Sequence, residues 1–234
     1  MLEERYVKIR VLNVLTVLAA ASIFGASPVQ ATLVPFTEEF SATSSNWRET
    51  GGVNPLAWNA AGGPDGSSYA SGPFNFLSSA PNATPAILRA HDAYNSSGDA
   101  FVGDWITEGV DQFSVSVRHN APTALTFFTR FAGSANFPGV AAVNFVPVAP
   151  NTWTSLTFAI MPGNPQFVFE GPGATFNTVF SSVGNVQIGV SVPASLAGTN
   201  QSYTFDVDKA SITPEPASLL LLAPALLLFK RRRS

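Results

Sequence analysis

The chain of 234 residues contains no cysteine. This absence excludes disulfide cross-links, thiolate metal sites and catalysis by a cysteine nucleophile. Histidine is scarce as well, because His91 and His119 are the two in the chain, and they do not form the His-Glu-x-x-His spacing of a zinc site. His119 ends a predicted strand and is expected to be exposed. The fold must therefore be held together without covalent cross-links, by burial of apolar side chains.

The usual arrangements of catalytic residues are missing too. No Gly-x-Ser-x-Gly turn offers a serine nucleophile. His91 and Asp92 are adjacent, and on an extended chain adjacent side chains point to opposite faces, which keeps a base from its orienting carboxylate. Glycoside hydrolysis requires two carboxylates across a cleft, and the scattered acids show no spacing that selects such a pair. We therefore expect no catalytic residues.

The N-terminus has the three parts of a secretory signal peptide. Lys8 and Arg10 precede an apolar run over residues 11–25, and a stretch of small residues then ends at Ala31. This order is typical of a segment that enters the Sec translocon and is cut by signal peptidase. We expect residues 1–31 to be removed after Ala31. An uncleaved N-terminal anchor is the alternative.

The last 21 residues form a three-part tail. Its parts are the motif Pro214-Glu215-Pro216, an apolar segment over residues 217–229, and the terminal cations Lys230, Arg231, Arg232 and Arg233. Prolines favour an extended, accessible backbone, and a basic cluster stops transfer and stays on the cytoplasmic side. The apolar segment reaches about 20 Å as a helix, whereas a hydrocarbon core is about 30 Å thick, so it suits a temporary membrane segment.

The order and position of these parts resemble the PEP-CTERM sorting signal of Gram-negative envelope proteins. The resemblance implies an exosortase-type processing enzyme as a partner. It also implies a transient inner-membrane intermediate, then delivery to the outer envelope or the extracellular space, in association with exopolysaccharide and biofilm. An ordinary tail anchor is the alternative. On this reading residues 32–213 form the exported domain and residues 214–234 the sorting signal.

The exported domain is acidic. Residues 32–213 contain five basic and twelve acidic residues, which gives a net charge of −7. Nucleic-acid binding requires clustered lysine and arginine, so nucleic acid is excluded as a partner. The length suits one domain with a sizeable core.

Apolar residues in this domain alternate with a period of two. The clearest example is residues 111–119, where Phe113, Val115 and Val117 alternate with polar neighbours. Further strands are predicted at 124–131, 140–146, 153–160, 166–170, 186–192 and 203–207. Clusters of Pro, Gly, Asn and Ser separate these runs. The pattern predicts an all-β, antiparallel, jelly-roll-like β-sandwich. Residues 41–84 are expected to form long loops laid over the sandwich, with strands at its edges.

Short strings along the domain resemble bacterial β-sandwiches related to carbohydrate-binding modules and the laminin B domain. These strings include Glu38-Glu39-Phe40, Gly103-Asp104-Trp105 and the closing strand at 203–212. The resemblance implies a structural calcium ion where the first and last strands meet, and no other cofactor is required. Calcium takes six to eight oxygen ligands, which would come from Glu38, Glu39, Asp65, Asp206 and Asp208. The alternative is that Asp206 and Asp208 are solvated acids on the outer face of a strand.

Three tryptophans in loop-like sequence are candidates for ligand binding: Trp47, Trp58 and Trp105. An exposed aromatic ring stacks on the flat apolar face of a sugar. The alternative is that these loops fold back and cap the ends of the sandwich, since tryptophan is highly buried on average. The sequence thus predicts an exported, non-catalytic envelope or matrix protein. The alternatives are a carbohydrate-binding adhesive module and a secreted glycosidase or esterase.

Overall fold

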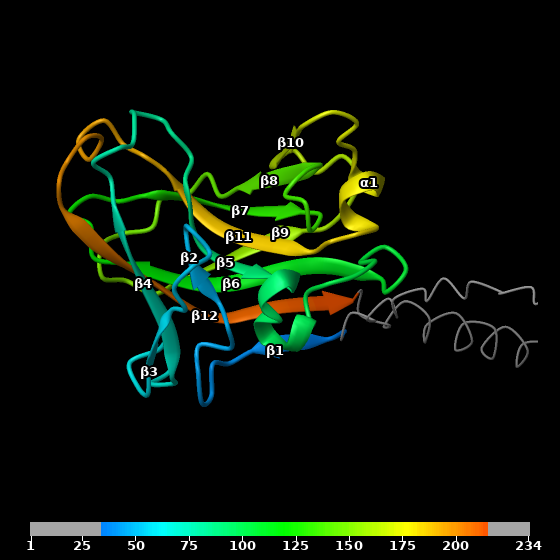
Figure 1. Ribbon diagram of the computed structural model, residues 1–234, viewed down its shortest axis with the longest axis horizontal. Coiled ribbons are helices and arrows are strands. Elements are labelled where there is room, and N and C mark those ends of the chain that lie inside the picture. The colour runs from blue at the N-terminus through cyan, green and yellow to red at the C-terminus, as the bar shows by residue number, and fades with distance from the viewer. Residues whose placement is uncertain (1–33, 215–234) are drawn as a thin grey trace, which may run out of the picture.

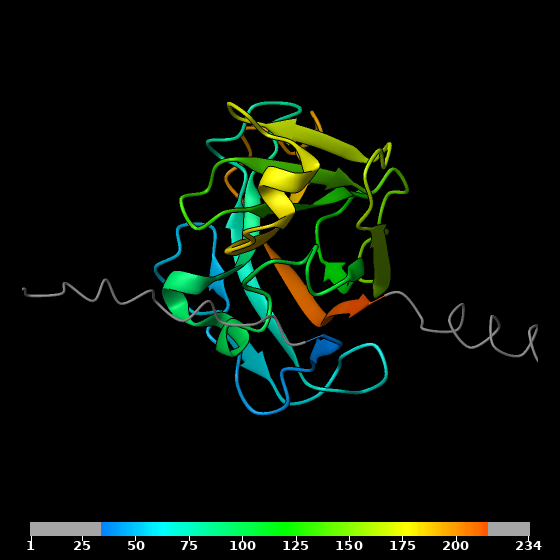
Figure 2. The same cartoon turned by 90° about the vertical axis from the view of Figure 1, so that its right-hand side faces the viewer.

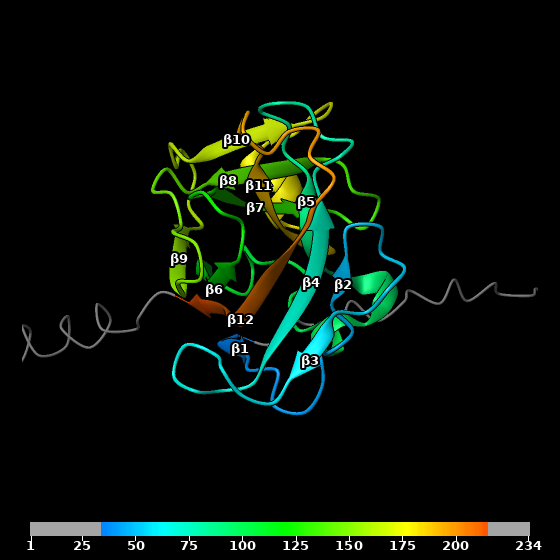
Figure 3. The same ribbon diagram turned by 90° about the vertical axis from the view of Figure 1, so that its left-hand side faces the viewer.

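The computed structural model describes residues 34–214, which form two antiparallel sheets packed face to face (Figure 1). Sheet A has the order β3 (Ala57–Asn59), β4 (Tyr69–Asn75), β12 (Ser202–Pro214), β6 (Val110–His119), β9 (Thr154–Ala159), and β1 (Phe36–Glu38) also pairs with β12. Sheet B has the order β10 (Phe167–Glu170), β8 (Gly139–Val143), β7 (Thr126–Ala132), β11 (Asn185–Ser191), β5 (Ala86–His91), β2 (Arg48–Glu49). In Figure 3, β10, β8, β7, β11 and β5 of sheet B lie above β6, β12 and β1 of sheet A. The predicted antiparallel β-sandwich is confirmed.

The two predicted targeting segments fall almost entirely outside the described residues. Of the proposed sorting motif, Pro214 is described as the last residue of β12, whereas Glu215, Pro216 and the segments after them are not. The same holds for residues 1–31. Among residues 34–214, no helix has the length and apolar character needed to span a bilayer.

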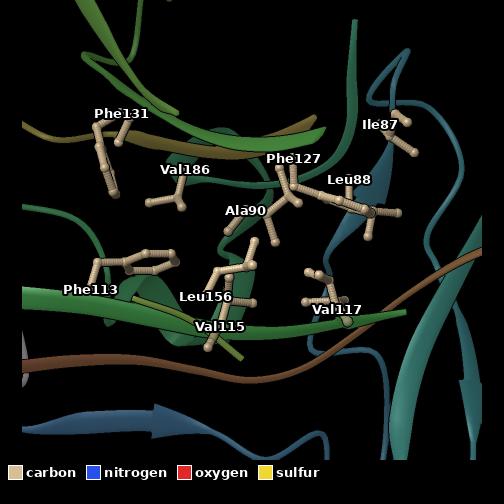
Figure 4. Close-up of a cluster of buried hydrophobic side chains, with 14 of the residues drawn as sticks. Ile87, Leu88, Ala90, Phe113, Val115, Val117, Phe127, Phe131, Leu156 and Val186 are labelled. Carbon is tan, nitrogen blue, oxygen red and sulfur yellow. The ribbon is translucent and has the colours of Figure 1, made fainter. Parts of the chain in front are cut away.

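The core lies between the sheets because strand side chains alternate between two faces. Phe113, Val115 and Val117 of β6 are fully buried and point toward sheet B (Figure 4). Phe131 of β7 points back from sheet B, and its ring meets that of Phe113 edge to face at 5.2 Å between centroids. Burying each such side chain contributes about 1.5–3 kcal/mol, so this row accounts for much of the stability.

One end of the sandwich is closed by the short helix α1 (Phe176–Phe180), visible in front of the sheets in Figure 2. Thr175 caps the helix in a reciprocal pair of hydrogen bonds with Thr178. Phe180 is buried, and its ring lies 5.9 Å from that of Trp105. Two 3-10 turns, η1 (Asp92–Tyr94) and η2 (Ser96–Asp99), follow β5.

Strand β12 is paired along both edges, and two different strands share one of them. β4 pairs with residues 202–207, β1 pairs with residues 210–212, and β6 runs along the other edge. The partner on the shared edge changes from β4 to β1 around Lys209. Its φ is 50°, and the register between β12 and β6 shifts there. A bulge of this kind bends and twists the strand locally, which lets one strand end and another begin beside it.

Residues 41–84 contain long loops together with β2, β3 and β4. β2 and β3 lie at sheet edges, whereas β4 lies inside sheet A and was not predicted. β4 lies next to β12 in sheet A. It includes Gly72 and Pro73, residue types that strands avoid, and these hid it in the sequence. Pro73 is tolerated because β3 pairs with Tyr69–Ser71 and not further along, so that edge has no strand partner at Pro73.

Candidate functional site

A groove of about 480 Å³ lies on the outer face of sheet B. It is lined by Thr84, Ala86, Arg89, Phe128, Arg130, Asn136, Phe137, Ala141, Val143, Val168, Glu170 and Gln187. Pockets that hold small ligands have volumes of about 300–1,000 Å³, so the groove is large enough for a ligand. Its side chains come from β5, β7, β8, β10 and β11 and from the loop between β7 and β8. The floor of the groove is therefore a sheet, which positions its side chains firmly.

The strand register places the lining side chains in a row. Residues that pair directly across neighbouring strands present their side chains on the same face. Starting at β5 and ending at β10, the paired residues are Arg89, Gln187, Arg130, Ala141 and Val168. The row is polar on its β5 side and apolar on its β10 side. An elongated ligand lying across the strands would meet both kinds of surface.

Arg130 organises the polar part of the groove and is 7% exposed. Its Nε donates to Glu170 Oε2 at 2.5 Å, and its Nη1 and Nη2 donate to the side-chain and backbone oxygens of Asn136 at 2.8 and 2.7 Å. Gln187 Nε2 also donates to Asn136 Oδ1, at 2.8 Å. The guanidinium carbon lies 4.9 Å from the centre of the Phe137 ring. These contacts hold the polar groups in fixed directions before any ligand arrives.

Two glycines make room for these side chains. A Cβ at Gly139 would meet the guanidinium of Arg130, and a Cβ at Gly189 would meet the ring of Phe128 and the carbonyl of Pro85. Gly189 pairs directly with Phe128 across β11 and β7, so the ring lies over the bare backbone of the next strand. The depth of the groove thus depends on two positions that carry no side chain.

The predicted ligand-binding tryptophans are not in this groove. Trp47 and Trp105 are 0% exposed, which corrects the expectation that they offer a free ring face to a ligand. Their loops fold back, and their indole nitrogens donate to Ser97 Oγ at 2.8 Å and to the Phe101 carbonyl at 3.0 Å. Trp58 is 41% exposed, but it lies on β3 in sheet A and donates to the carbonyl of Phe40. The exposed ring in the groove is Phe137, which stands in a Phe-Pro-Gly turn and was missed for that reason.

Asp206 and Asp208 point to the outer face of sheet A, as predicted, but they are 6% and 0% exposed. The loop between β3 and β4 covers them, so they are not solvated acids. Asp206 accepts from Arg118 Nε at 2.7 Å, and Asp208 accepts from Ser67 Oγ at 2.6 Å and from its own neighbour's backbone amide at 2.8 Å. Burial raises the pKa of both carboxyls, which the hydrogen bonds from Arg118 and Ser67 partly offset.

The five predicted calcium ligands do not surround one point. Asp65 and Asp208 lie close to Lys209, whose ammonium donates to Asp65 Oδ2 at 2.5 Å and lowers the pKa of that carboxyl to about 2. The negative charge of Glu39 contributes to raising the pKa of Asp208 and of Lys209. Glu38 accepts instead from the backbone amide of Phe40 at 2.7 Å, and Asp206 is held by Arg118.

Within residues 34–214, no three His, Asp or Glu side chains lie close enough together to hold a metal ion. Lys209 is ion-paired with Asp65, while Glu38 and Asp206 have partners elsewhere, so the five predicted ligands do not form one calcium site. Calcium remains a prediction from sequence. It expects a melting temperature that falls when a chelator is added, and unchanged melting curves would count against it.

The histidines also differ from expectation. His119 was expected to be exposed, but it is 1% exposed and one ring nitrogen lies 3.0 Å from the Val148 carbonyl. Burial lowers the pKa of its imidazole. His91 Nδ1 and Asp92 Oδ1 do meet, at 2.5 Å, because the chain leaves the strand and turns into η1 at Asp92. Ser134 donates to the other oxygen of Asp92 and not to His91. The Ser134 hydroxyl is therefore not placed as a nucleophile activated by this histidine.

No family model matches the chain, and no curated protein matches it. Among solved structures, the endo-1,4-β-D-xylanase 10B of Clostridium thermocellum (N-terminal CBM22-1 and GH10 modules, with xylohexaose) has a TM-score of 0.47 and 16% identity, covering 77% of this chain and 28% of that one. An exo-β-agarase has a TM-score of 0.49 and 10% identity, and the match covers 79% of this chain and 26% of the agarase. The family 11 carbohydrate-binding module of C. thermocellum, with a β-1,3-1,4-mixed-linked tetrasaccharide, has a TM-score of 0.46 and 11% identity, covering 78% and 98%.

The chain spans only about a quarter of the length of the xylanase and the agarase. Because all three TM-scores are below 0.5, we base no conclusion about function on them.

Proposed function

We propose that this chain is an exported, non-catalytic carbohydrate-binding protein and that the groove on sheet B holds a polysaccharide. The observation that supports this most is the row from Arg89 to Val168, which combines fixed hydrogen-bonding groups with apolar surface on an open strand face. A sugar ring presents hydroxyls around its edge and carbon–hydrogen groups on its faces. It therefore needs both kinds of surface at once, and a polymer needs a groove that is open at its ends.

The charges in the groove favour binding over catalysis. Among its lining residues, Glu170 is the one carboxylate, and it is ion-paired with Arg130 at 2.5 Å. Hydrolysis of a glycosidic bond requires a proton donor and a second carboxylate on opposite sides of that bond. The groove supplies neither group in a free state. A secreted glycosidase or esterase is thus the less supported alternative.

Replacement of Phe137 by alanine is expected to weaken polysaccharide binding at least about tenfold, as loss of an aromatic anchor does at other binding sites. The side chain is 54% exposed, so the melting temperature should hardly change. Phe145→Ala is a matched control, because that phenylalanine is 69% exposed and does not line the groove. Affinity electrophoresis of the full chain in gels containing neutral and acidic polysaccharides measures both variants. The proposal fails if the wild type is retarded by no polymer, or if both variants lose binding equally.

We also propose that the tail directs sorting, with Pro214-Glu215-Pro216 as the motif recognised by an exosortase-type enzyme. The order of motif, apolar segment and cations supports this. Replacing the three motif residues by alanine is expected to leave export intact and to retain the protein at the inner membrane with residues 230–233 attached. Intact-mass analysis of protein released by cells carrying the natural motif decides the matter. Released chains that still end at Ser234 would show that the tail is not cut.

A further inference from the structure

Arg89 lies in the groove without an anionic partner. It comes from β5, the strand next to the β2 edge of sheet B, where it pairs with Gln187 on one side and with Arg48 on the other. Its Nε is buried and has no hydrogen-bond partner among the described residues. None of the ion pairs within residues 34–214 includes it. The domain contains twelve acidic residues, so Arg89 does not lack an anionic partner for want of carboxylates.

The neighbouring strand adds a second cation instead of an acid. Arg48 is directly opposite Arg89 in the register of β2 and β5, and like charges at opposite positions destabilise a sheet. Arg48 uses its Nη1 to donate to the Gly52 carbonyl at 3.0 Å, and its guanidinium lies 4.1 Å from the centre of the Tyr94 ring. Neither contact supplies negative charge. The β5 end of the groove therefore has positive potential, whereas Glu170 neutralises Arg130 further along.

From this arrangement we infer that the groove selects polysaccharides that carry anionic groups, and that Arg89 binds such a group. The inference rests on the proposed function and names the class of ligand for the same groove. A partly buried guanidinium is costly unless it is paired, and its planar fork matches the two oxygens of a carboxylate or two oxygens of a sulfate ester. Gln187, beside it in the row, is 3% exposed and bonded to Asn136, so the anionic group is assigned to Arg89.

The net charge of the domain makes the inference specific. At −7, residues 32–213 repel a polyanion as a whole. Binding of an acidic polymer would therefore reflect the local charge at Arg89 and not general attraction. It should also weaken as salt screens that charge.

The experiment compares polymers that share a backbone and differ in charge. Polygalacturonate and its methyl ester test the carboxylate, and dextran sulfate and dextran test the sulfate ester. The full chain is expected to bind one acidic polymer about tenfold more tightly than its neutral form, the ratio that 1.4 kcal/mol produces. Arg89→Gln should bind the acidic and neutral forms equally, and Arg89→Lys should keep part of the preference because it retains the charge and loses the fork.

Lys209→Gln is the matched control, since it also removes one cation but lies in sheet A, away from the groove. It should keep the preference of the wild type. Melting curves check that each variant is folded. If Arg89→Gln does not fold, the test is Arg89→Lys, whose preference for the acidic polymer should be smaller than that of the wild type. Two outcomes overturn the inference but leave the proposed function standing. In the first, the wild type binds the acidic and neutral forms equally. In the second, the preference for the acidic form survives in Arg89→Gln. Failure of the wild type to bind any of these four polymers also overturns the inference, whereas the proposed function itself fails if no polysaccharide in the affinity gels retards the chain.

Discussion

Trp105→Ala is expected to lower the free energy of unfolding by about 3–5 kcal/mol, the usual cost of deleting a large aromatic side chain from a core. Trp105 is 0% exposed and closes the end of the sandwich where α1 lies. Its ring lies 5.2 Å from that of Phe131 and 5.9 Å from that of Phe180. Alanine would leave a cavity between these rings and would orphan the carbonyl of Phe101, which accepts from the indole nitrogen.

Trp58→Ala provides the comparison, because that side chain is 41% exposed. Its loss removes one hydrogen bond, to the carbonyl of Phe40, and should cost about 1 kcal/mol. Equilibrium unfolding in urea measures both variants. Similar losses for the two would mean that Trp105 is not buried as described. Reduced glycan binding by Trp105→Ala at unchanged stability would favour the ligand role that its loop position suggests.

Asp206→Ala is expected to lower the free energy of unfolding by about 2–3 kcal/mol. Removing one partner of a fully buried ion pair costs about 3–5 kcal/mol, because the other charge is left unpaired. The value here is reduced because the Arg118 side chain is 25% exposed. Arg118 also lies against the rings of Tyr69 and Trp153, at 5.0 and 4.7 Å from their centres, and donates to the Gly62 carbonyl at 3.2 Å, so these contacts hold its charge in place.

A double-mutant cycle with Arg118→Met separates this effect from simple loss of packing. The double variant Asp206→Ala/Arg118→Met contains no unpaired charge, so it should be more stable than the sum of the two single changes predicts. Urea unfolding of the four proteins gives the coupling energy directly. Additive losses would mean that the two side chains contribute to stability independently and that the contact at 2.7 Å carries no net interaction.

The strands that the sequence predicted well are those whose two faces differ most in polarity. β6, β11 and the first part of β12 have apolar residues on the core face and polar residues on the other, so the period of two is visible. β4 was missed because Gly72 and Pro73 are typical of turns. Gly72 serves packing instead, since a Cβ there would approach the side chains of Leu56 and Leu88.

The groove could not be predicted from the sequence in the same way. Arg89, Arg130 and Gln187 are separated by 41 to 98 positions along the chain, and the pairing of β5, β11 and β7 makes them neighbours. Pairing depends on long-range packing, which local patterns do not contain. The cover over Asp206 and Asp208 was hidden for a similar reason, because the residues that bury them belong to a loop near Ser67.

The double pairing of β12 determines how the domain would resist force. Its final residue, Pro214, is also the first residue of the proposed sorting motif, so tension from a tethered tail would enter the domain along this strand. The hydrogen bonds to β6 on one edge and to β4 and β1 on the other lie across that direction. They would be loaded in shear, together, and not peeled apart one after another. Tension applied at Pro214 would therefore be shared by many hydrogen bonds at once and would not unzip the domain from that end.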